Sequence, residues 1–310
     1  MKGQVRILIA FDGSDQAMET VRYASRFFAP EGVRVHLFHV ANQVPEAFFD
    51  LRHEPAFSQT VISVGAWASE VKHKMENDFI RAAEILKNAG FPDEAIQSTY
   101  HSRQVGVARD IVAESRQDYD VLMIGRSGVS RLMNVVVGSV ANKLINAAGH
   151  LPVAVVGGSP EAERVLVGID GSDGAAKAVA CAGDLMARPD REVMLCHVVR
   201  SLNVFLKVQQ VFSSEEEKRW LEESRAAVTP AIAAAENQLI DAGFHPGNIY
   251  QEVREEQHSR AGGIVEAVRQ GDFGTIVVGR RGLSGVQEFS IGRVSRKVIH
   301  MGDQMAVWVV

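Results

Sequence analysis

Two copies of the tripeptide Asp-Gly-Ser directly follow an apolar segment with the composition of a β-strand. The first copy is Asp12–Ser14, after the run Arg6–Phe11, and the second is Asp170–Ser172, after Arg164–Ile169. Glycine permits the tight turn between a strand and a helix, and serine is a favoured cap for the helix that follows. The aspartate offers a carboxylate to a ribose hydroxyl or to a metal ion. Because many strand-to-helix turns use these residues, the tripeptide alone is a weak signal of a ligand site.

A glycine-rich segment farther along the first copy has the composition of a phosphate site. Gly125 and Gly128 follow an apolar run, and after nine intervening residues Gly138 and Ser139 open a predicted helix. Bare backbone N–H groups at a strand exit and at a helix start favour a bound anion. Gly-Lys occurs nowhere in the chain, and no Gly-x-Gly-x-x-Gly follows a strand, which excludes a P-loop and a dinucleotide fingerprint.

The second copy keeps this spacing but changes one residue type. Gly279, Gly282 and Gly292 match the three glycines, while Arg293 takes the place of the serine hydroxyl. Two interpretations stay open: the second phosphate site is lost, or the arginine contacts phosphate as a charged donor.

These residues belong to a duplicated α/β unit. Asp170 lies 158 residues after Asp12, and Gly279 lies 154 residues after Gly125. Within one copy, apolar runs alternate with amphipathic segments, which predicts two tandem doubly wound, Rossmann-like domains, each with a five-stranded parallel sheet. The turn-forming segment Gly157–Pro160 places the boundary between domain 1, residues 1–158, and domain 2, residues 159–310. For the first copy we expect strands at 5–11, 33–40, 95–100, 120–125 and 152–156, and helices at 14–28, 66–89, 105–117 and 139–148.

Composition narrows the class of protein. A net charge of −5 disfavours nucleic acid as a partner. No apolar stretch approaches the length of a membrane span, and Asp12 interrupts the first apolar run short of a signal-peptide core. The chain has two cysteines, Cys181 and Cys196, with no framework spacing. We therefore expect a cytoplasmic protein with reduced thiols and Cys196 as a buried apolar residue.

Asp-Gly-Ser, the pair Gly125 and Gly128, and Gly138-Ser139, in this order, resemble the pattern of the universal stress protein family, in particular its ATP-binding branch and its tandem members. The resemblance implies that ATP or AMP binds with Asp12 near the ribose or a nucleotide-bound Mg²⁺, and with the backbone of Val40 beside the adenine. It further implies a set of residues at or beside the phosphates and a matching set in domain 2. The first set is Gly125, Arg126, Gly128, Gly138, Ser139 and Val140, and the second is Asp170, Val198, Gly279, Gly282 and Gly292.

The resemblance also implies how the two halves meet. In this family the last strand commonly forms a dimer interface. Here the last strands, Pro152–Val156 and Met305–Val310, would pair with each other about a pseudo-twofold axis, with Trp308 in the seam. Further self-association into a homodimer is also compatible with the sequence.

Three functions remain open. The first is a stress-response protein that binds an adenine nucleotide and acts through ligand-dependent conformation or an unidentified protein partner. The second is a nucleotide-free assembly module, whose partner surface would include Phe48, Phe49 and Phe57 in the connection 41–65. The third, a slow ATP hydrolase, has the weakest support, because no nucleophile–base pair or catalytic carboxylate cluster is evident and we assign no catalytic residue.

Overall fold

The computed structural model describes residues 4–41, 58–127, 137–160, 164–202, 212–283 and 290–310. Domain 1 contains β1 (Val5–Ala10), α1 (Asp15–Phe27), β2 (Val33–Ala41), α3 (Ser58–Asn88), β3 (Ile96–Ser102), α4 (Val107–Glu114), β4 (Val121–Gly125), α5 (Ser139–Ala147) and β5 (Val153–Val156). Domain 2 contains β6 (Arg164–Gly168), α6 (Asp173–Met186), β7 (Glu192–Arg200), α7 (Ser214–Ala242), β8 (Ile249–Gln257), α8 (Arg260–Gly271), β9 (Thr275–Val278), α9 (Arg293–Met301) and β10 (Ala306–Val309).

The two halves share one ten-stranded sheet. Its strand order is β3-β2-β1-β4-β5-β10-β9-β6-β7-β8. Every pairing within a half is parallel, and the two halves meet where β5 and β10 pair antiparallel, with Trp308 opposite Ala154. The predicted pair of five-stranded parallel sheets, joined through their last strands, is confirmed.

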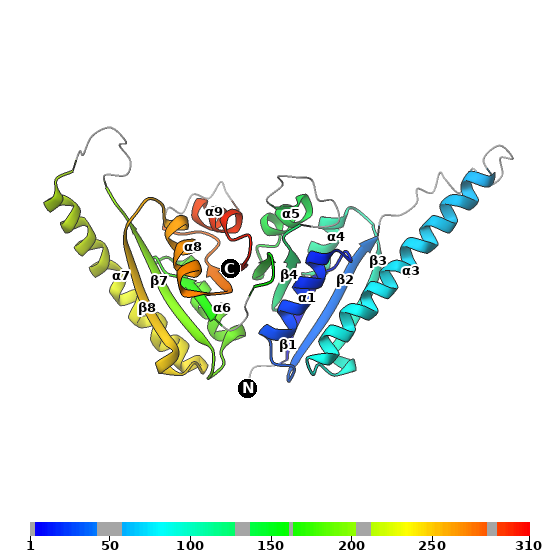
Figure 1. The fold of residues 1–310 in the computed structure, drawn as a ribbon, viewed down its shortest axis with the longest axis horizontal. Helices are drawn as coiled ribbons and strands as arrows, with labels where there is room; N and C mark the ends of the chain where they lie inside the picture. The colour runs from blue at the N-terminus through cyan, green and yellow to red at the C-terminus, as the bar shows by residue number, and fades with distance from the viewer. Residues whose placement is uncertain (1–3, 42–57, 128–136, 161–163, 203–211, 284–289) are drawn as a thin grey trace.

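Helices cover both faces of this sheet, and each face has its own core. Side chains of α1, α3, α6 and α7 pack on one face, and those of α4, α5, α8 and α9 pack on the other. Both cores run across the boundary between the halves. In Figure 1 the long helices α3 and α7 form the two outer flanks, while α5 and α9 lie beside the seam.

A buried polar chain crosses the seam. Trp308 is fully buried, and its Nε1 donates to Tyr23 Oη of α1 at 3.1 Å. Tyr23 Oη lies 2.8 Å from Thr275 Oγ1 of β9. The predicted position of Trp308 is therefore confirmed, and its polar atom is satisfied by the other half of the chain.

The long helix of domain 1 starts earlier than expected. The sequence suggests a connection up to Gly65, but α3 already begins at Ser58. A single glycine costs a helix only about 1 kcal/mol, so Gly65 does not end it. The predicted aromatic segment with Phe48, Phe49 and Phe57 lies outside the described residues. No helix in the described parts of the chain combines the length and hydropathy required to cross a membrane.

Candidate functional site

The strand order places a topological switch point in each half. In domain 1 the chain runs from β1 to β2 and β3 on one side, then returns to β4 and β5 on the other. Neighbouring parallel strands whose connections leave in opposite directions open a crevice at their carboxyl ends, where ligands bind in doubly wound sheets. This switch point falls between β1 and β4, and in domain 2 between β6 and β9.

The Asp-Gly-Ser turn of domain 1 forms the predicted local structure. Gly13 has a φ of +73°, which favours glycine, and Ser14 Oγ accepts from the N–H of Ala17 at 3.1 Å, which caps α1. Asp12 Oδ1 accepts from the N–H of Ser14 at 3.0 Å. The carboxylate of Asp12 is thereby held at the carboxyl end of β1, at the switch point.

The glycine-rich connection of domain 1 is closed by a backbone hydrogen bond. The N–H of Gly138 donates to the carbonyl of Arg126 at 2.8 Å, so the start of α5 lies against the exit of β4. Gly125 faces α1 so closely that a Cβ would lie 3.2 Å from the backbone of Gln16. Ser139, the first residue of α5, is exposed.

Two residues of the proposed domain 1 site remain to be placed. Val140 follows Ser139 and is 36% exposed at the start of α5. Gly128 lies outside the described residues. Helix α5 thus brings one exposed hydroxyl and its N-terminal N–H groups to the edge of the crevice.

Val40 and His39 lie at the carboxyl end of β2. The Val40 side chain is buried. His39 Nδ1 lies 2.9 Å from the carbonyl oxygen of Phe11, and burial lowers the pKa of His39. A neutral imidazole therefore donates from Nδ1 to Phe11.

Asp78 of α3 is a neighbour of the turn that the sequence did not reveal. It is buried, and a Cβ on Gly13 would lie 2.6 Å from Asp78 Oδ2. Arg81 pairs with the same carboxyl group at 3.1 Å. The sequence does not indicate this contact, because Asp78 is far from Asp12 along the chain and lies within a long helix. Domain 1 thus has a second carboxylate beside this turn.

The matching region of domain 2 is a cavity of about 770 Å³. It is lined by all the domain 2 residues that the family resemblance implies, together with Arg293. These residues are Asp170, Val198, Gly279, Gly282 and Gly292. The structure therefore brings them together, from three different strands and one helix start.

Close backbone approaches shape this cavity. A Cβ on Gly282 would lie 2.5 Å from Asp170 Oδ2, and one on Gly279 would lie 2.3 Å from the backbone of Gly174. Asp170 Oδ1 accepts from the N–H of Ser172 at 3.0 Å and from its hydroxyl at 2.5 Å. Glycine is thus required at both loop positions by contact with α6 and with the aspartate.

The side chain of Arg126 does not lie at the phosphate site, which corrects the expectation for this residue. It is buried, and it donates to the carbonyl oxygens of Gly302 at 3.1 Å and His300 at 2.7 Å, at the C-terminal end of α9. Arg280 does the reverse: its guanidinium donates to the carbonyls of Ile145 and Ala148 at the end of α5. The strand exit faces the seam, so both arginines bind the other half of the chain.

Other basic residues do surround the domain 2 cavity. Arg281, Arg296 and Lys297 line it beside Arg293. Arg200 and Arg260 also line it, and sequence reasoning missed both, because they come from the end of β7 and the start of α8. Nothing in their local sequence indicates that these segments converge.

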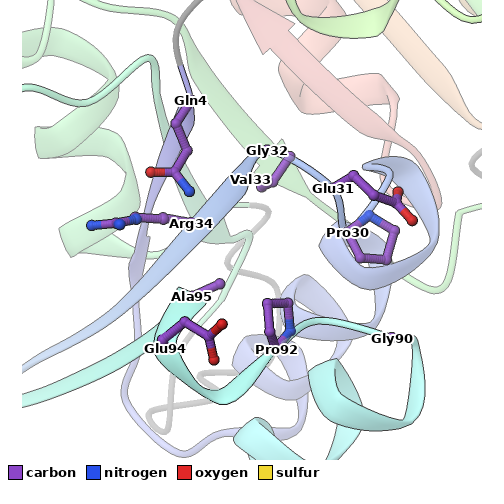
Figure 2. Close-up of a pocket in the computed structure, with 10 residues that line it drawn as sticks. All are labelled: Gln4, Pro30, Glu31, Gly32, Val33, Arg34, Gly90, Pro92, Glu94 and Ala95. Atoms are coloured by element: carbon purple, nitrogen blue, oxygen red, sulfur yellow. The ribbon is translucent and has the colours of Figure 1, made fainter.

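A second hollow, of about 480 Å³, lies at the opposite edge of domain 1. Figure 2 shows Gln4, Arg34 and Glu94 around it, near the amino ends of β1 and β2. Ligands of doubly wound sheets bind beyond the carboxyl ends of the strands. We therefore do not assign this hollow to the nucleotide crevice.

The described residues contain no cluster of three or more His, Cys, Asp or Glu side chains arranged to hold a metal ion. An ion at Asp12 would therefore need further ligands from a bound phosphate chain. Cys196 lines the domain 2 cavity but is buried, and burial raises the pKa of its thiol to about 12. The expectation that it is a buried apolar residue is confirmed.

Comparison with known proteins identifies the family. The model of the universal stress protein family matches residues 5–157 and again residues 161–310. The chain therefore belongs to the universal stress protein family, as a tandem member with two such domains.

Several relatives match over one or both halves. A universal stress protein of Mycolicibacterium smegmatis is 24% identical over 94% of this chain and 92% of its own length. Universal stress protein YxiE of Bacillus subtilis is 30% identical over 44% of this chain and 90% of its own length. The crystal structure of a universal stress protein from Archaeoglobus fulgidus aligns with a TM-score of 0.62 over 98% of this chain and 97% of that one, at 17% identity, which supports the fold.

Proposed function

We propose that this protein is a cytoplasmic stress-response protein that binds an adenine nucleotide, ATP or AMP, in domain 1. The observation that carries the proposal is the convergence of Asp12, Val40 and the start of α5 at one switch point. Val40 is the penultimate residue of β2, Asp12 follows β1, and Gly125 ends β4, so the three lie on or directly after adjacent strands in that order. This order matches a base, a ribose and a phosphate chain laid across the sheet edge.

Each part of the site has a proposed role. The backbone of Val40 lies beside the adenine, and Asp12 accepts from a ribose hydroxyl or contacts a nucleotide-bound Mg²⁺. The N–H groups at Gly138 and the Ser139 hydroxyl hold phosphate oxygens, and the family resemblance adds Gly128 to this set. The N-terminus of α5 carries the positive end of the helix dipole, which favours this anion.

The nucleotide acts through conformation or partner binding in this proposal, and turnover is not required. Helix α5 begins at the proposed phosphate site and ends on Arg280 of domain 2. A phosphate that repositions the start of α5 would change the contact between the halves.

The first test is to identify what the purified protein carries. The protein is prepared without added nucleotide and denatured, and the released small molecules are separated by chromatography. We expect ATP or AMP, and a loss of that nucleotide in Asp12→Ala and Ser139→Ala. Losing one hydrogen bond to a charged phosphate corresponds to about a ten- to hundredfold weaker affinity.

Two results would replace the proposal. If no nucleotide is released and none binds on titration with ATP and Mg²⁺, the duplicated fold is better explained as an assembly module. If the protein releases phosphate steadily from ATP and Asp12→Ala abolishes that release, the protein is a hydrolase.

A further inference from the structure

The cavity of domain 2 is surrounded by positive charge. Six cationic side chains line it, and among the described lining residues the one acidic side chain is Asp170. The six are Arg200, Arg260, Arg281, Arg293, Arg296 and Lys297. They come from the end of β7, the start of α8, the loop after β9 and the first turns of α9, so separate parts of the chain supply charge to one space.

Helix α9 directs three of these charges to the same side. Arg293, Arg296 and Lys297 are spaced i, i+3 and i+4, which places them on one helix face. All three are exposed, whereas Val298 and Ile299 are buried against the sheet. All three also line the cavity.

The start of α9 concentrates positive charge at the edge of the cavity. Cations in the first turn oppose the helix dipole, whose positive end lies at the N-terminus. Arg293 is the first residue of α9, and the first turn holds no acidic residue. Arg281 and Arg260 add like charge from the neighbouring segments. A bound polyanion would interact favourably with these charges, and would gain hydrogen bonds from several guanidinium groups.

The duplicated scaffold does not require these cations, because domain 1 lacks most of them. At the 154-residue offset of the glycines, Ser127, Ser139 and Asn142 match Arg281, Arg293 and Arg296. Domain 1 instead has Asp78 beside the turn after β1. The two sites thus differ in charge while sharing the same backbone plan.

The cavity also has an apolar side. Ile169 after β6, Val198 of β7 and Ile264 of α8 line it. An inorganic polyphosphate would leave these side chains without a complementary group, whereas the base of a nucleotide would cover them.

We propose that the domain 2 cavity binds a highly phosphorylated nucleotide, in the class of the nucleoside tetraphosphates, and binds it without a divalent metal ion. The arginines of α9 and the loop after β9 neutralise the phosphate chain, a role that Mg²⁺ has in the site proposed for domain 1. The inference extends nucleotide binding to domain 2, but it rests on a separate cavity and separate residues.

The test is calorimetric titration of the full-length protein with adenosine tetraphosphate, ATP and inorganic tripolyphosphate, each in EDTA and in Mg²⁺. We expect the tetraphosphate to bind in EDTA about tenfold more tightly than ATP or tripolyphosphate, and to bind more weakly as Mg²⁺ or salt is added, because both screen its charge. Binding at domain 1 has the opposite dependence on Mg²⁺ and is lost in Asp12→Ala, so the two proposals fail independently.

Two matched double variants each remove two positive charges from exposed positions. Arg293→Ser with Arg296→Asn gives α9 the residues of α5, and we expect it to weaken tetraphosphate binding by about thirtyfold or more. Lys74→Asn with Lys177→Ser removes the same charge from α3 and α6, away from the cavity lining, and should leave the affinity unchanged. On binding, amide hydrogen exchange should slow in α9.

Three outcomes would overturn the proposal. The first is equal tetraphosphate affinity in the α9 variant and the wild type. The second is a requirement for Mg²⁺, and the third is tripolyphosphate binding as tightly as the nucleotide.

Discussion

Trp308 joins the two halves of the chain, and its removal should destabilise the whole sheet. The side chain is fully buried opposite Ala154 of β5. Its ring centroid lies 5.6 Å from that of Phe27 and 6.2 Å from that of Phe28, both from domain 1. Its Nε1 donates to Tyr23 Oη. Every one of these contacts crosses from domain 2 to domain 1.

The expected magnitude follows from these contacts. Trp308→Ala removes a large buried ring and leaves a cavity, which typically costs about 3–5 kcal/mol of unfolding free energy. Tyr23 Oη keeps its contact with Thr275 at 2.8 Å, so it is not left without a partner. Trp308→Phe keeps most of the ring but loses the hydrogen bond, and should cost about 1–2 kcal/mol.

Urea unfolding followed by far-ultraviolet circular dichroism measures these differences. The matched control is Trp67→Ala, because Trp67 of α3 is 57% exposed, and we expect a change within about 0.5 kcal/mol. Small-angle scattering below the transition should show a less compact chain for Trp308→Ala. If Trp308→Ala lowers the free energy of unfolding by less than about 1 kcal/mol and leaves the compactness unchanged, Trp308 does not hold the two halves together as we infer.

Three further predictions concern the interface, the buried histidines and the close backbone contacts. Arg126→Gln removes charge-assisted hydrogen bonds to two carbonyls at the end of α9. Scanning calorimetry should show that the free energy of unfolding falls by about 3 kcal/mol. An unchanged melting temperature would contradict this prediction. Burial lowers the pKa of His36, so below about pH 6.5 the unfolded chain binds more protons and stability falls as pH falls. His36→Gln should flatten that slope in urea unfolding from pH 7 to pH 5, and an unchanged slope would show that His36 does not contribute. Gly279→Ala places a Cβ 2.3 Å from the backbone of Gly174 and should lower the free energy of thermal unfolding by about 1–3 kcal/mol. The control Gly149→Ala, whose added Cβ would have no atom within 4 Å, should leave it unchanged. Equal effects of the two substitutions would argue against the close contact at Gly279.

The fold was predictable from the sequence because the signals are local and repeated. Strands such as Val121–Gly125 are apolar on both faces, as buried parallel strands require, and the Asp-Gly-Ser turns recur at the starts of α1 and α6. The seam position of Trp308 followed from the resemblance to a family whose last strand commonly forms a dimer interface.

The charge of the sites was not predictable in the same way. Arg126 is adjacent to Gly125 in the chain, yet its side chain turns to α9, a direction that only the packing of the two halves determines. Asp78 reaches the turn after β1, and Arg200 and Arg260 reach the domain 2 cavity, from segments distant in sequence. Such convergence depends on tertiary structure and leaves no pattern in the local sequence.

The central claim is that domain 1 binds an adenine nucleotide through Asp12 and the start of α5. Calorimetric titration of the nucleotide-free protein with ATP and Mg²⁺ tests it most directly, with Asp12→Ala as the site variant and the exposed Asp93→Ala, at the opposite edge of the sheet, as the control. We predict saturable binding that weakens at least about tenfold in Asp12→Ala and is unchanged in Asp93→Ala. Absence of binding heat, or equal affinity in all three proteins, would contradict the account.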